Sequence, residues 1–166
     1  MKPSDFFPSI PQDVREWLDE RASYLGWPPA GDEWYGVLRG LSLATWQRLE
    51  WERRVVALDP ATLTGDTKLI VSGLYDAVFD GVQNEYSGLG CSQQKIAEII
   101  EYVRANNELP GVLIFLEGDD GLLDVVDGCH RLALYFALCR QMATQQVLGG
   151  TCDAWVGRIG SSSAEV

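Results

Sequence analysis

Cationic side chains, histidine and cysteine are scarce in this sequence of 166 residues. The 13 Lys and Arg against 24 Asp and Glu give a formal net charge of -11. This balance argues against nucleic-acid binding, because phosphate neutralisation needs clustered cations. A single histidine and four cysteines with no Cys-x-x-Cys pair argue against a structural zinc site, so we expect no metal site built by the protein alone.

Long uncharged apolar runs are also missing. No stretch reaches the length of a membrane-spanning helix without charges, which predicts that the protein does not enter a membrane. The first residues, 1–11, lack the basic start and apolar run of a signal peptide. We therefore expect a cytoplasmic location with reduced thiols.

The hydrophobic content of 46% is enough for a packed core, and the first third of the chain reads as helical. Apolar residues at helical spacing predict one helix in the stretch 11–29, ended by Gly26 and Pro28, and a second that starts at Ser42 and stops before Pro60. The composition changes over 59–68, which is typical of a linker. We predict a helical N-terminal extension over 1–60, a domain over 61–160 and a disordered tail over 161–166.

Tryptophan is concentrated before residue 52. The five tryptophans of this region are Trp17, Trp27, Trp34, Trp46 and Trp51. Such a density is consistent with a face that binds a partner or with the packing surface of helices against a neighbouring domain.

The second part of the chain mixes helical and strand patterns. Residues 69–79 read as a buried strand, with a helix beginning at Tyr75 as the alternative. A helix is predicted over 92–110, where isoleucines recur at helical spacing. The apolar runs 111–116 and 122–126 flank Glu-Gly-Asp-Asp-Gly, which predicts a hairpin. A helix over 131–141 and a strand over 152–159 follow, so the expected class is α+β.

The stretch Asp-Gly-Cys-His-Arg, 127–131, lies between the predicted strand and helix and contains the only histidine. The first amides and the positive dipole end of a helix form an anion site, which Gly128 would leave open to close approach. Arg131 could hold phosphate oxygens, His130 could donate or shuttle a proton, and Cys129 would have its pKa lowered there. Alternatively, Asp127 caps the helix and Cys129 is a small buried hydrophobe.

Residues 92–138 resemble the core of the ParB N-terminal/sulfiredoxin superfamily. The Gly-Cys-His-Arg run at 128–131 is similar to that of sulfiredoxin, and Gln93 to Gly118 has the spacing of its lysine-bearing helix, proline and strand. The longer form at 127–132 looks like the wider set of ParB-like proteins, which includes free serine kinases. The resemblance implies a mixed sheet with helices, and it does not cover residues 1–60.

The resemblance also implies residue roles. Gly128, the neighbouring Cys129, His130 and Arg131 would hold nucleotide phosphates, assisted by Lys95. Cys129 would be the reacting thiol of a sulfiredoxin.

In a kinase, Asp127 would act as acid, base or metal-positioning group. Glu85 would be a second catalytic carboxylate, with a solvated loop acid as the alternative. ATP or ADP and magnesium are the implied cofactors, because charge on a transferred phosphoryl group must be neutralised.

Two functions remain open from the sequence. The first is a nucleotide-dependent phosphotransferase acting on a small hydroxyl compound or a protein sulfinate. The second is a non-catalytic acidic module, such as an inhibitor, immunity or accessory protein, that binds a basic protein through its tryptophan-rich N-terminal face.

Overall fold

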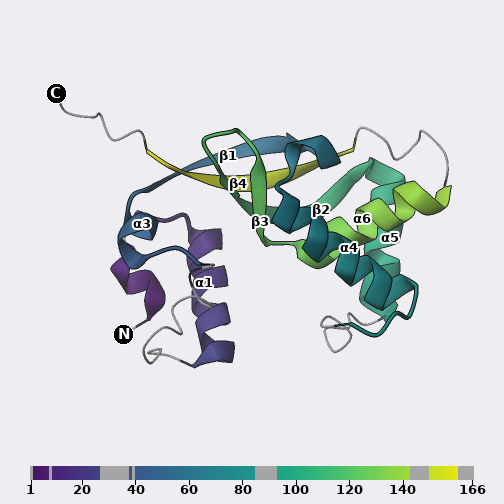
Figure 1. Cartoon of the computed structure of the whole chain (residues 1–166), viewed down its shortest axis with the longest axis horizontal. Coiled ribbons are helices and arrows are strands. Elements are labelled where there is room, and N and C mark those ends of the chain that lie inside the picture. Colours follow the sequence, from purple (N-terminus) through teal and green to yellow (C-terminus); the bar gives the residue numbers. More distant parts are fainter. Residues whose placement is uncertain are drawn as a thin grey trace.

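The structure is a computed structural model that describes residues 2–7, 9–26, 38, 40–84, 93–142 and 150–160. Its centre is a four-stranded mixed sheet with the strand order β1-β4-β2-β3 (Figure 1). The strands are β1 (Leu49–Ala57), β2 (Glu108–Glu117), β3 (Leu123–Asp127) and β4 (Thr151–Ile159). β4 runs antiparallel to β1 and parallel to β2, while β2 and β3 form an antiparallel hairpin. The predicted α+β class is confirmed.

Helices pack on both faces of this sheet. The helices are α1 (Gln12–Leu25), α3 (Leu43–Gln47), α4 (Gly65–Phe79), α5 (Gln93–Asn106) and α6 (Cys129–Met142), with short 3-10 turns η1 (Pro3–Phe6) and η3 (Pro60–Thr62). Alternation along β2 separates two cores, because successive side chains of a strand point to opposite faces. Leu113 and Phe115 pack with α4, α5 and α6, whereas Ile114 packs with α1 and α3.

The tryptophans of the N-terminal segment contribute to the second core. Trp46 is almost fully buried and donates its indole N–H to the carbonyl oxygen of Leu38 at 2.7 Å. Trp17 stacks on Trp46 with ring centroids 6.2 Å apart, and the ring centroid of Trp51 lies 6.0 Å from that of Trp46. For these three residues the packing interpretation is supported. Trp27 and Trp34 lie outside the described residues.

The helix predicted to start at Ser42 and stop before Pro60 is wrong beyond Gln47. Ser42 does cap α3, where its hydroxyl accepts from the Thr45 N–H, but the helix has only five residues. From Leu49 the chain forms β1 and pairs with β4 over nine residues. Apolar residues in 49–57 fit either period, and cross-sheet pairing decides in favour of the strand. The segment 1–60 is therefore not a purely helical extension.

The strand predicted over 69–79 is also wrong, because these residues belong to α4. The helix begins at Gly65, well before the alternative start at Tyr75, and the hydroxyl of Thr64 caps it by accepting from the Thr67 N–H. Thr67, Val71 and Leu74 are buried at helical spacing. The segment read as a linker thus contains the cap of α4 and the turn η3.

Three predictions for the C-terminal half are confirmed. The hairpin forms as β2 and β3, the last helix forms as α6, and the closing strand forms as β4. α5 also forms, from Gln93, while its predicted cap Ser92 lies outside the described residues, as does the tail 161–166. Within the described ranges, no helix is both long enough and apolar enough to cross a membrane.

Candidate functional site

The Asp127–Arg131 stretch forms the turn between β3 and α6. Asp127 is the last residue of β3, and Cys129 is the first residue of α6. Gly128 joins them with φ of +110°, a conformation that L side chains rarely adopt. A Cβ at this position would also lie 2.6 Å from Cγ of Leu113, so the turn requires glycine for both reasons.

The guanidinium of Arg131 points back to the start of β2. Its Nη1 donates to the carbonyl oxygen of Pro110 at 3.0 Å, and both terminal nitrogens lie 3.5 Å from the carbonyl oxygen of Val112. Nη2 also reaches Oδ2 of Asp127 at 3.4 Å. The side chain of Arg131 is 21% exposed. Arg131 therefore holds three chain segments together at the turn.

The first residues of α6 differ in exposure. His130 is exposed on the first turn of the helix, whereas Cys129 is half-buried and packs against the core beneath α6. Cys129 is thus only partly the small buried hydrophobe of the alternative interpretation, and His130 is the exposed side chain of the first turn.

The other candidates come from elsewhere in the chain. Lys95 is exposed near the start of α5, a different helix from the one that carries His130. Glu85 lies outside the described residues. The structure thus brings together Asp127, Arg131 and the first turn of α6.

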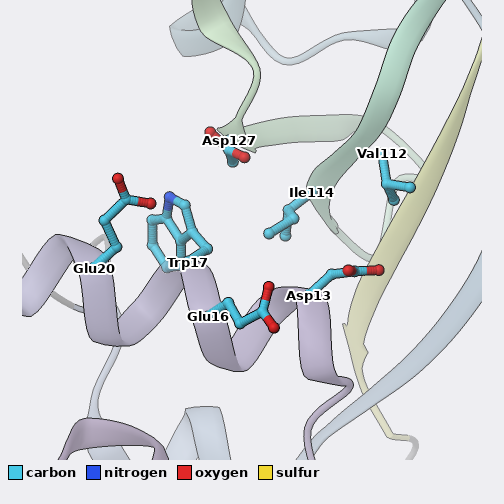
Figure 2. A pocket seen from close by; sticks show the side chains of 7 residues that line it. All are labelled: Asp13, Glu16, Trp17, Glu20, Val112, Ile114 and Asp127. Atoms are coloured by element: carbon cyan, nitrogen blue, oxygen red, sulfur yellow. The ribbon is translucent and has the colours of Figure 1, made fainter.

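A cavity of about 280 Å³ opens beside the turn, between α1 and the sheet (Figure 2). Its lining residues are Asp13, Glu16, Trp17, Glu20, Val112, Ile114 and Asp127. Four of the seven are carboxylates, and the α1 members repeat at helical spacing, which places them on one helix face. Sequence reasoning missed this cavity, although the acidic stripe on the predicted helix was a visible signal.

The walls of the cavity are fixed by contacts between distant segments. The indole N–H of Trp155 on β4 donates to Oδ2 of Asp13 at 2.8 Å, which ties α1 to the sheet. Arg53 of β1 lies opposite Trp155, and its guanidinium donates to the carboxylate of Asp153 on β4. This hydrogen bond raises the pKa of the Arg53 guanidinium and lowers the pKa of the Asp153 carboxyl. Asp127 lines the cavity and contacts Arg131, so it connects the cavity to the turn.

Comparison of the chain with protein-family models, with curated proteins and with solved structures found no match.

The turn has features that fit a nucleotide phosphate. A helix of 14 residues begins at Cys129, and His130 is exposed on its first turn, whereas Gly128 is buried against Leu113. Among the described residues, no group of three or more His, Cys, Asp or Glu side chains could hold a metal ion. A magnesium ion that arrives with phosphates needs only one or two protein carboxylates, and the half-exposed Asp127 could supply one.

Proposed function

We propose that this protein binds a nucleotide at the β3–α6 turn and transfers a phosphoryl group to or from a second substrate. The observation that supports this best is the exposed His130 on the first turn of α6, beside Gly128 at φ +110°. A helix start with an exposed imidazole is a suitable environment for phosphate oxygens.

The order of elements from α5 to α6 is the second support for this proposal. It is a helix, two strands and a helix, which is the order that the ParB/sulfiredoxin resemblance implies for this part of the chain. We therefore propose a ParB/sulfiredoxin-like protein that uses ATP or ADP with magnesium. The acceptor would be a small hydroxyl compound or a protein sulfinate.

Each residue of the turn would have a separate task. His130 and the α6 amides would bind the phosphates, while Asp127 would take up a proton or position the magnesium ion. Lys95 would contribute a charge from α5. The thiol of Cys129 would react in a sulfiredoxin-like chemistry and would be inert in a kinase-like one. Glu85 remains a proposed second carboxylate.

A second function is favoured by the acidic cavity. Carboxylates from α1 and Asp127 surround a hollow that is also lined by Trp17, a combination suited to a cationic side chain of a partner. In this alternative the protein is a non-catalytic module that recognises a basic protein, and α1 carries the recognition surface.

Thermal unfolding with ligands separates the two functions. The purified protein is heated with ATP, ADP, CTP or GTP, each with and without magnesium. Binding to the native state raises the midpoint, and a ligand at 100 times its Kd adds about 2.7 kcal/mol. We expect a shift with at least one nucleotide that is lost in His130→Ala.

Lys68→Ala provides the matched control, because Lys68 is exposed on α4 and is remote in sequence from the turn. The shift should persist in this variant. If no nucleotide moves the wild-type midpoint, the nucleotide proposal is rejected and the second function is pursued with basic partners.

A further inference from the structure

The contacts of Arg131 differ from those of a side chain that waits for an anion. Its two terminal nitrogens face the carbonyl oxygens of Pro110 and Val112 on one side and the carboxylate of Asp127 on the other. A guanidinium offers its donors in a rigid planar fork, so a bound phosphate would have to compete with these acceptors.

The segment of β2 that Arg131 contacts is irregular. The β2–β4 pairing shifts register between Glu108 and Val112, and Gly111 within this stretch has φ of +75°. A Cβ on Gly111 would lie 2.8 Å from Nη1 of Arg131. The arginine head group is thus packed closely against the backbone of the bulge.

The same head group also reaches the turn. Nη2 of Arg131 lies 3.5 Å from the position that a Cβ of Gly128 would occupy, and 3.4 Å from Oδ2 of Asp127. The bulge of β2 and the β3–α6 turn are therefore joined through one side chain. A change at the bulge should be transmitted to the backbone of the turn.

We infer that Arg131 is a positioning residue: it fixes the β2 bulge against the β3–α6 turn, and it does not itself bind the phosphate. The inference rests on the proposed nucleotide site, and it departs from the role that the sequence resemblance implies for this arginine. Phosphate binding then depends on His130 and the α6 amides, whose placement Arg131 controls.

Four variants test this inference from both sides of the contact. Arg131→Met removes the guanidinium, and Arg131→Lys keeps the charge but cannot form the fork to two carbonyls. Gly111→Ala leaves the arginine intact and pushes a methyl group against it. Gly121→Ala is the matched control, because Gly121 has φ of +78° but no atom within 4 Å of the position that an added methyl group would occupy.

Two quantities are measured at a temperature where every variant is folded: affinity for the nucleotide identified by the unfolding screen, and the amide resonances of Gly128, Cys129 and His130 without ligand. We expect Arg131→Met, Arg131→Lys and Gly111→Ala each to lose affinity by roughly 10- to 100-fold, as when partners that orient binding groups are removed. The three variants should also shift the turn amides, and Gly121→Ala should do neither.

Retained affinity in both Arg131→Lys and Gly111→Ala, with loss only in Arg131→Met, would identify Arg131 as a phosphate ligand and overturn the inference. Unmoved turn amides in Gly111→Ala and Arg131→Lys would overturn it as well. If the wild type binds no nucleotide, the proposed function fails, and the amide resonances alone still decide whether Arg131 positions the turn.

Discussion

Replacing Gly128 with alanine should lower the free energy of unfolding for two separate reasons. The first is the backbone, because φ of +110° is unfavourable for an L side chain and costs about 1–2 kcal/mol. The second is overpacking, because the new methyl group would lie 2.6 Å from Cγ of the fully buried Leu113, which costs about 1–3 kcal/mol. We expect Gly128→Ala to lower the free energy of unfolding by about 2–5 kcal/mol.

A double-mutant cycle with Leu113→Ala isolates the second term. Leu113→Ala alone should cost about 2–5 kcal/mol through the cavity that it leaves. In the double variant the cavity accepts the alanine methyl group, so the combined loss should fall short of the sum by about 1–3 kcal/mol. Only the backbone term of Gly128→Ala then remains.

Urea unfolding followed by circular dichroism measures all four corners of the cycle. Gly121→Ala serves as the control for a positive φ without overpacking, since Gly121 has φ of +78° and no neighbouring atom within 4 Å. It should cost about 1–2 kcal/mol. Strict additivity in the cycle would refute the packing argument for Gly128 and leave its conformation as the only reason for glycine.

Two further predictions concern stability. Thr67→Val should lower the free energy of unfolding, measured with urea, by about 2–3 kcal/mol. The buried hydroxyl of Thr67 accepts the N–H of the fully buried Val125 and donates to Asp124. The control Thr62→Val removes only an exposed hydrogen bond of η3 and should cost under about 1 kcal/mol. Equal losses would contradict this role of Thr67. Burial raises the pKa of the Cys152 thiol from 9.0 to about 12, so its stabilising contribution is complete below pH 9 and is lost as the pH rises toward 12. Between about pH 8 and about pH 10 the wild type should therefore lose about 1.4 kcal/mol more than Cys152→Ala, and identical losses would show that this thiol does not titrate in the unfolding reaction.

The elements that could be predicted from the sequence carry local signals. α5 and α6 follow from helical spacing, and the β2–β3 hairpin follows from two apolar runs around a glycine and aspartate turn. β1 could not be identified because its partner β4 is distant in the chain, and only that pairing excludes the helix. The apolar run of α4 predicts a strand, with a helix from Tyr75 as the alternative, unless the cap at Thr64 is recognised.

The candidate site likewise has features that local sequence patterns predict and features that depend on contacts between distant segments. The position of the Asp127–Arg131 stretch between a strand and a helix was predictable, since both flanking patterns are adjacent in sequence. The contacts of Arg131 with Pro110 and Val112 were not, because they depend on a register shift in another strand. The acidic stripe of α1 is visible in the sequence, but the cavity also requires the packing of α1 against β2, which no local pattern indicates.

The position of β4 in the sheet has a consequence for how the chain folds during synthesis. β4 is the last of the four strands to leave the ribosome, yet it lies between β1 and β2 and pairs with both. Until it emerges, β1 lacks the strand with which it pairs, and β2 has only the hairpin partner β3. Contacts between segments so distant in sequence slow folding, so the sheet can close only after β4 has been made.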